Sequence, residues 1–185
     1  MSDGKPSLRS RLPELAIEAA MVVFAVLVAL GVEEWREERQ LREFADRARG
    51  AVAAEVGANL EELRSTGAAL DSTATLLSRV VRENDVSLLT GGLALVLPDF
   101  SAAAWRTAQT SQASAYLDYD WMIEVSRAYE LIEFYSSVAT QVVEAMSVII
   151  MRAPTVEGLN SISGRLVVLT GLHGQLEERL EALGD

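Results

Sequence analysis

The sequence contains no cysteine, a single histidine, four prolines and few aromatic residues (6% of 185). The lack of cysteine excludes disulfides and thiolate zinc sites and leaves the redox compartment open. The scarcity of proline, beside a composition rich in Ala, Leu, Val, Glu and Arg, favours helix over strand. The 16 basic residues are outnumbered by 27 acidic ones, for a net charge of −11. This balance argues against nucleic acid as a partner, because phosphates require a basic surface.

Residue patterns that would indicate catalysis are also missing. No serine has a plausible triad partner beyond His173, and there is neither a phosphate-binding glycine loop nor a metal-ligand spacing. Acidic pairs such as Glu177 and Glu178 could act as acid and base, but helix surface explains them better. We therefore predict that the chain is not an enzyme and uses no cofactor and no metal. No small-molecule substrate is evident.

One long hydrophobic run stands near the N-terminus. Residues 15–32 read "LAIEAAMVVFAVLVALGV", with Glu18 as the only charge. At 1.5 Å per residue, these 18 residues measure about 27 Å, close to the hydrocarbon thickness of a bilayer. We predict a transmembrane helix here, after an N-terminal tail over residues 1–14, with Trp35 as an interfacial anchor. Glu18 is then either a side chain that reaches the headgroups or a polar contact to another span.

Two alternatives to a membrane span remain open. The run could be a secretory signal, because basic residues precede it and Ala29-Leu30-Gly31 resembles a cleavage site. It could also be a buried core helix, although no later segment is apolar enough to surround it. The count of basic residues on the two sides is nearly tied, and we expect the N-terminus inside and the body outside the cytoplasm.

Residues 33–185 are predicted to form one helical bundle domain. The expected elements are a long helix over about 33–83, a connection over 84–100, a short helix over about 101–111, and two helices over about 119–152 and 155–183. Apolar residues three and four apart form a seam on each long helix, which specifies an all-α, coiled-coil-like bundle of three helices, with the later two antiparallel. Asp118 and Thr155 are the expected caps of the later helices, and Asp99 or Ser101 of the short one.

The seam of the first long helix is predicted to contain the following residues: Leu41, Phe44, Ala48, Val52, Val56, Leu60, Leu63, Gly67, Leu70, Ala74, Leu77 and Val81. This helix measures roughly 70 Å, against about 45 Å for each of the later two. Part of its seam therefore lacks a partner within the chain, so we expect self-association or a membrane protein partner beside the lipid bilayer. His173 lies on the third seam, where it is predicted to be a core or interface residue.

Several short motifs resemble those of a known group. They are "AL" at the end of the hydrophobic run, "WREER" at residues 35–39, "AWRTA" at 104–108, "LDY" at 117–119 and "YE" at 129–130. With these motifs, the chain resembles a group of uncharacterised bacterial single-pass membrane-anchored helical proteins. The resemblance covers about half the chain. It implies a single-pass bacterial membrane protein of unknown activity, and it supplies no catalytic residue. Together with the expected orientation, this predicts a location in the bacterial inner (cytoplasmic) membrane with a periplasmic body.

The segment 104–119 is the candidate partner surface. It combines aromatic area with hydrogen-bonding groups on an otherwise regular bundle, in Trp105, Arg106, Gln109, Tyr116, Asp118 and Tyr119. The alternative is that Trp105 is buried and holds the short helix onto the bundle.

The function predicted from the sequence is that of a membrane-anchored helical scaffold or accessory subunit of a membrane complex, acting by protein–protein binding. A sensor with a ligand-binding bundle that signals through a partner is one alternative. A stalk-like subunit of an ion-driven machine is another.

Overall fold

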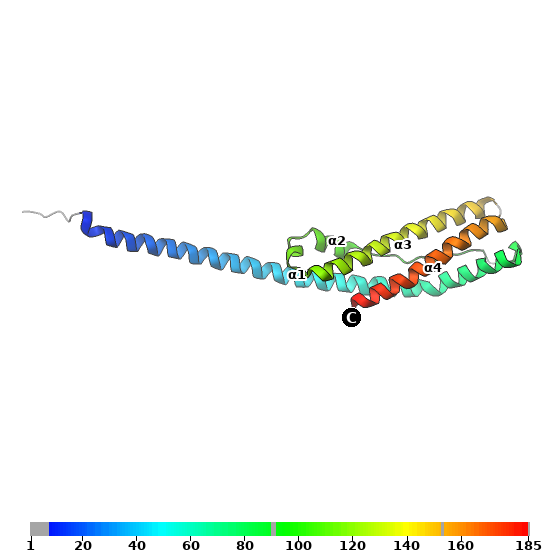
Figure 1. Ribbon diagram of the computed structural model, residues 1–185, viewed down its shortest axis with the longest axis horizontal. Helices are drawn as coiled ribbons and strands as arrows, with labels where there is room; N and C mark the ends of the chain where they lie inside the picture. Colours follow the sequence, from blue (N-terminus) through cyan, green and yellow to red (C-terminus); the bar gives the residue numbers. More distant parts are fainter. Residues whose placement is uncertain (1–7, 90–91, 153, 185) are drawn as a thin grey trace, which may run out of the picture. The chain divides into compact units, whose positions relative to one another are not determined.

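Figure 1 shows a computed structural model of the chain, which describes residues 8–89, 92–152 and 154–184. Over these residues the protein is all-helical and contains no strand, as predicted. The elements in order are α1 (Leu8–Glu83), η1 (Val86–Leu89), α2 (Ala103–Thr110), η2 (Gln112–Tyr116), α3 (Tyr119–Arg152) and α4 (Val156–Gly184). Of the expected N-terminal tail, residues 1–7 lie outside the described residues, whereas residues 8–14 belong to α1.

The chain divides into two units, Met1–Phe44 and Ala45–Asp185. In the first unit, the large apolar side chains of α1 are exposed: Ile17, Met21, Val22, Val23, Phe24, Val26, Leu27, Val28, Leu30 and Val32. After this stretch, Arg42 pairs with Glu38 at 2.6 Å and Arg39 with Glu43 at 3.0 Å, one helical turn apart. These i,i+4 pairs are typical of a solvated helix surface.

The expectation of a membrane span is wrong. In the part of the chain that the structure describes, no helix combines the length and apolar character needed to cross a bilayer. The predicted inner-membrane location with a periplasmic body is therefore wrong as well. The predicted role of Trp35 as a membrane anchor depended on the span and falls with it.

The second unit has a hydrophobic core built by α1, α3 and α4. The α4 seam is buried as its spacing predicts, and its members are Leu159, Ile162, Leu166, Leu169, His173, Leu176 and Leu180. The α3 seam is buried likewise through Val125, Ala128, Ile132, Tyr135, Ala139, Val142 and Met146. The helical bundle predicted from these patterns is confirmed. Its centre lies where the three seams meet.

The buried face of α1 differs from the predicted seam at both of its ends and in its middle. At the ends, Ala45 and Val80 are buried, whereas the predicted Phe44 is 40% exposed and Val81 is only partly buried. In the middle of α1, three polar side chains are buried among the aliphatic ones: Asn59, Thr66 and Thr73. They follow one another at intervals of seven residues. The predicted seam positions Leu60, Gly67 and Ala74 stand one residue later and are only partly buried. A polar residue every heptad on a buried face needs hydrogen-bond partners, because an unsatisfied buried polar group is costly.

Two of those partners come from an extended segment, residues 93–102, which runs back along α1 (Figure 1). The Thr73 hydroxyl donates to the Ala94 carbonyl at 2.9 Å. The Asn59 side chain donates to the Ser101 carbonyl at 2.8 Å and accepts from the Ser101 amide at 2.9 Å. The predicted connection therefore packs on the bundle, and it places its apolar residues against the core through Leu93, Leu95, Leu97 and Phe100. Thr90 and Gly91 of this connection lie outside the described residues.

Contacts between the long helices give their directions. Arg49 of α1 lies over the Trp121 ring of α3. Further along both helices, Glu55 of α1 bonds Tyr129 of α3. Residue numbers therefore rise in the same direction along α1 and α3, and the two helices are parallel. By contrast, Gly67 faces His173 and Arg64 pairs with Glu177, so α4 runs opposite to α1. Figure 1 likewise shows α4 antiparallel to α3. A parallel pair of consecutive long helices requires a return connection, which residues 93–102 supply.

Local signals set the helix ends. Helix α1 ends in a Schellman motif, in which the Asp85 amide bonds the Val80 carbonyl and the Asn84 amide bonds the Val81 carbonyl. Asn84 has a φ of 53°, in the left-handed region that asparagine tolerates better than most residues. The Asp118 carboxylate accepts from the Trp121 amide at 2.8 Å and caps α3. The Thr155 hydroxyl accepts from the Gly158 amide at 3.2 Å and caps α4, so both predicted caps are present.

Candidate functional site

The start of α2 is fixed by a carboxylate from another helix. Oε2 of Glu55, on α1, accepts from the Ser101 hydroxyl at 2.7 Å and the Ala104 amide at 2.9 Å. Its Oε1 accepts from the Trp105 amide at 3.1 Å and the Tyr129 hydroxyl at 2.6 Å. A carboxylate at a helix N-terminus satisfies free amides and complements the helix dipole. Glu55 therefore supplies most of the capping that was expected of Asp99 or Ser101. The N-cap residue, Ala102, makes no side-chain bond, and the Ser101 hydroxyl accepts only from the Ala103 amide, at 3.4 Å.

The same contacts set the ionisation of this cluster. Partial burial works to raise the pKa of the Glu55 carboxyl, but the bonds from Tyr129, Ala104, Ser101 and Trp105 together hold that pKa below its ordinary value. Burial, and then the neighbouring carboxylate, raise the pKa of Tyr129 above its ordinary value. Glu55 is therefore charged and Tyr129 neutral at neutral pH. The arrangement stabilises the structure by a charge-assisted hydrogen bond.

The Trp105 side chain is buried and is not exposed for a partner to contact. Only 4% of its surface is exposed, and its ring stacks on Tyr129 at 5.8 Å and 13°. It also meets the edge of Trp121 at 6.4 Å and 83°. Such pairs add to the free energy gained from burying the rings. The structure thus places Trp105 where the alternative interpretation put it, holding the short helix onto the bundle.

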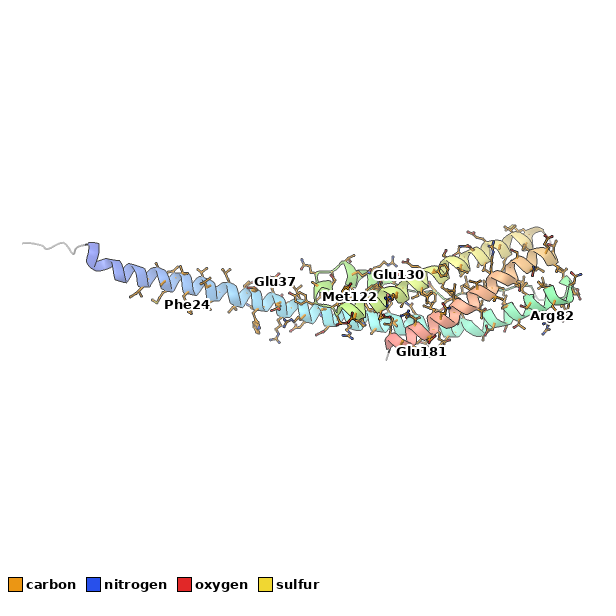
Figure 2. All side chains as sticks on the ribbon, in the orientation of Figure 1. Phe24, Glu37, Arg82, Met122, Glu130 and Glu181 are labelled. Atoms are coloured by element: carbon orange, nitrogen blue, oxygen red, sulfur yellow. The ribbon has the colours of Figure 1, made fainter. Side chains whose placement is uncertain are left out.

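A groove runs beside this helix, between residues 98–109 and α3. Its volume is about 760 Å³. Arg106 and Gln109 line it from α2, Glu130 and Glu133 line it from α3, and Asp99 lines it from the segment before α2. These five polar residues are exposed, and Figure 2 shows Glu130 on the α3 surface. Three carboxylates against one guanidinium give the groove a negative rim. It can therefore receive a segment that carries positive charge.

The other residues of the predicted partner surface lie outside the groove lining. Asp118 is exposed and caps α3. Tyr116 is 39% exposed and Tyr119 is 74% exposed. The structure therefore brings Trp105, Arg106 and Gln109 together at the groove and leaves Tyr116, Asp118 and Tyr119 on the adjoining surface.

The remaining predicted site residues are on the first unit. Glu18 is exposed on α1. Trp35 is 58% exposed, and the Arg39 guanidinium lies 5.8 Å from its ring centre. This cation–π contact belongs to the helix surface.

His173 lies in the core of the bundle, 8% exposed. Its Nδ1 is 3.5 Å from the Tyr135 hydroxyl, and its Nε2 faces Gly67, where an added Cβ would lie only 3.0 Å away. Burial lowers the pKa of His173, against the opposing effect of Glu177 and Asp71, and burial raises the pKa of Tyr135 to about 12. Among the described side chains, no three His, Cys, Asp or Glu gather in a way that could hold a metal ion.

Sequence reasoning missed Glu55, Asn59, Thr73 and Tyr129, which hold the connection and α2 in place. The available signal was the heptad spacing of Asn59, Thr66, Thr73 and Val80, which continues from Val52. A search restricted to apolar residues passes over it.

Comparison of the chain with protein families, curated proteins and solved structures found no match. The resemblance to bacterial membrane-anchored helical proteins therefore stays a prediction, and any functional argument has to come from the geometry.

Proposed function

We propose that this protein is a helical scaffold or accessory subunit that acts by protein–protein binding, with the apolar stretch of α1 joining one copy to another. The observation that carries the proposal is the exposure of that stretch. Its large side chains are 47–69% exposed, from Val28 to Phe24. Exposed apolar surface of this extent is typical of an interaction site. Figure 2 shows Phe24, the most exposed of these ten residues, on the surface of α1.

A second copy suits this stretch because its apolar residues surround the helix. Between Ala19 and Val32 there is no polar stripe, so the helix has no face that prefers water. Association of copies removes apolar area from water at about 25 cal/mol per Å². The paired charges that follow, at residues 38–43, keep the adjoining helix surface solvated.

The bundle contributes the second part of the proposal, a specific partner site. The groove lined by Arg106, Gln109, Glu130 and Glu133 combines directed hydrogen bonds with a negative rim. The exposed Tyr116 and Tyr119 add aromatic area beside it. A partner segment with basic residues fits this chemistry, whereas a nucleic acid does not.

Light scattering on the purified full chain tests the first part. We expect an oligomer that dissociates when Leu27 and Leu30 are both replaced by glutamine, with helicity by circular dichroism unchanged. Val168→Gln is the matched control, since Val168 is 53% exposed on the bundle and its replacement should leave the mass unchanged. A wild-type chain that is monomeric at all concentrations contradicts self-association through this stretch.

A further inference from the structure

A second hollow, distinct from the groove, lies between α1 and α4. Its volume is about 520 Å³, within the range of small-molecule sites. It is lined by Asp71, Ala74, Thr75, Ser78, Arg79, Arg82, Val167 and Thr170. Two arginines and three residues with hydroxyl groups thus line one space, with aliphatic carbon beside them.

The arginines of this hollow differ from the others described in the bundle. Arg64, Arg127 and Arg179 pair with glutamates, and Arg49 lies over Trp121. Arg106 and Arg165 donate to backbone carbonyls. Arg79 and Arg82 make no hydrogen bond or ion pair with any described residue, although the chain has an excess of carboxylates. Figure 2 shows Arg82 at the surface near the C-terminal end of α1.

Thr170 supplies an independent observation. Its Oγ1 is buried and has no hydrogen-bond partner among the described residues, which is the exception in folded proteins. Other helix hydroxyls of this bundle bond a carbonyl one turn back, for example Ser72 to Ala68 and Thr140 to Ser136. Because this oxygen is closed to solvent, it reaches a ligand oxygen in the hollow only when the Thr170 side chain turns toward it.

We propose that this hollow binds a small organic phosphate. A phosphate group accepts several hydrogen bonds at once, and arginine forks match its geometry. The hydroxyls of Thr75, Ser78 and Thr170 add neutral donors. The hollow exceeds what a bare phosphate fills, and Val167 and Ala74 line it with aliphatic carbon, so the ligand carries an apolar group beside its phosphate. Asp71 opposes the anion and limits its affinity.

Calorimetric titration of the full chain with phenyl phosphate, at constant ionic strength, tests this proposal. We expect saturable binding, weaker binding of inorganic phosphate, and none of phenol. Arg79→Gln and Arg82→Gln should each weaken binding about tenfold, because each removes a charge-assisted bond. Asp71→Asn should strengthen it. Thr170→Val, which keeps the side-chain volume, should weaken it by a smaller factor.

Arg165→Gln is the matched control, because Arg165 is an exposed arginine outside the hollow. Circular dichroism shows whether each variant is folded, and only folded variants are compared. Wild-type protein that shows no saturable heat with phenyl phosphate overturns the proposal. So does binding that Arg79→Gln and Arg82→Gln leave unchanged relative to Arg165→Gln. Neither outcome bears on self-association through α1.

Discussion

Helix α1 contains two stretches that invert the usual relation between hydrophobicity and burial. Residues 19–32 carry no charge and hardly a polar atom in their side chains, yet their large side chains are exposed. Residues 45–80 contain charges throughout and bury Asn59, Thr66 and Thr73 beside leucine and valine. The difference lies in what packs against each stretch. In the bundle, α3, α4 and residues 93–102 cover one face of the helix and supply partners for its polar groups.

The largest effect on stability is expected when a charge is placed in the bundle, and the same charge in the apolar stretch provides the comparison. Leu166→Asp buries an unpaired carboxylate on a fully buried α4 position and should cost several kcal/mol, about 3–5, in the free energy of unfolding. Leu27→Asp, at a side chain that is 61% exposed, should leave the unfolding of the bundle unchanged. Urea titration followed by circular dichroism measures both. Equal destabilisation by the two variants would mean that the apolar stretch is buried in the folded chain.

A smaller effect is expected from the polar attachment of α2. Glu55→Ala removes the acceptor of four hydrogen bonds, two of them from the first turn of α2 and one from Ser101 just before it, and should cost about 2–3 kcal/mol. The fluorescence of Trp105 should shift toward that of an exposed indole. Glu61→Ala is the matched control, because Glu61 is an exposed carboxylate on the same helix. If Glu55→Ala lowers the free energy of unfolding no more than Glu61→Ala does, the attachment of α2 through Glu55 is unimportant for stability.

Two ionisable groups of the bundle, His173 and Glu55, should make its stability depend on pH. The lowered pKa of His173 means that the unfolded chain binds its proton more readily, so stability should fall as the pH is lowered through the ordinary value of 6.5. The lowered pKa of Glu55 adds a second loss below its ordinary value of 4.5.

Thermal melts from pH 8 to pH 3 measure both losses. His173→Gln should remove the first and leave the second, and Glu55→Gln should do the opposite. Asp71 and Glu177 act on His173 against the effect of its burial, which sets the direction of the first loss. A stability profile that is flat between pH 7 and pH 5 in the wild type would refute the role of His173.

The smallest effect separates open helix surface from close packing within the bundle. Gly57→Ala meets nothing within 4 Å and should stabilise the bundle by about 0.5–1 kcal/mol through helix propensity. Gly67→Ala places a Cβ 3.0 Å from Nε2 of His173 and should lose that gain. Melting temperatures of the two variants give the comparison. If both alanines stabilise equally, the approach of α4 to Gly67 is not close.

Much of the bundle could be predicted because its determinants are local and periodic. Aliphatic residues three and four apart mark the buried faces of α3 and α4, and Asn84, Asp118 and Thr155 mark helix ends by chemistry that involves only their neighbours in sequence. The site around α2 was predicted less well. Trp105, Arg106 and Gln109 were identified as special, but Trp105 is held by Glu55, 50 residues away, and Glu55 in turn bonds Tyr129, 74 residues further along the chain.

The sequence by itself determined the helical class, the helix ends and the faces of α3 and α4, because hydrophobic period and capping are read within a few residues. Tertiary structure decided which face of α1 is buried, since Asn59 and Thr73 are acceptable in a core only where Ser101 and Ala94 meet them. It also decided that Trp105 is buried and that Arg79, Arg82 and Thr170 share one hollow. These features depend on contacts between segments that are far apart in the sequence. A local pattern of side chains does not show which distant segments will come into contact.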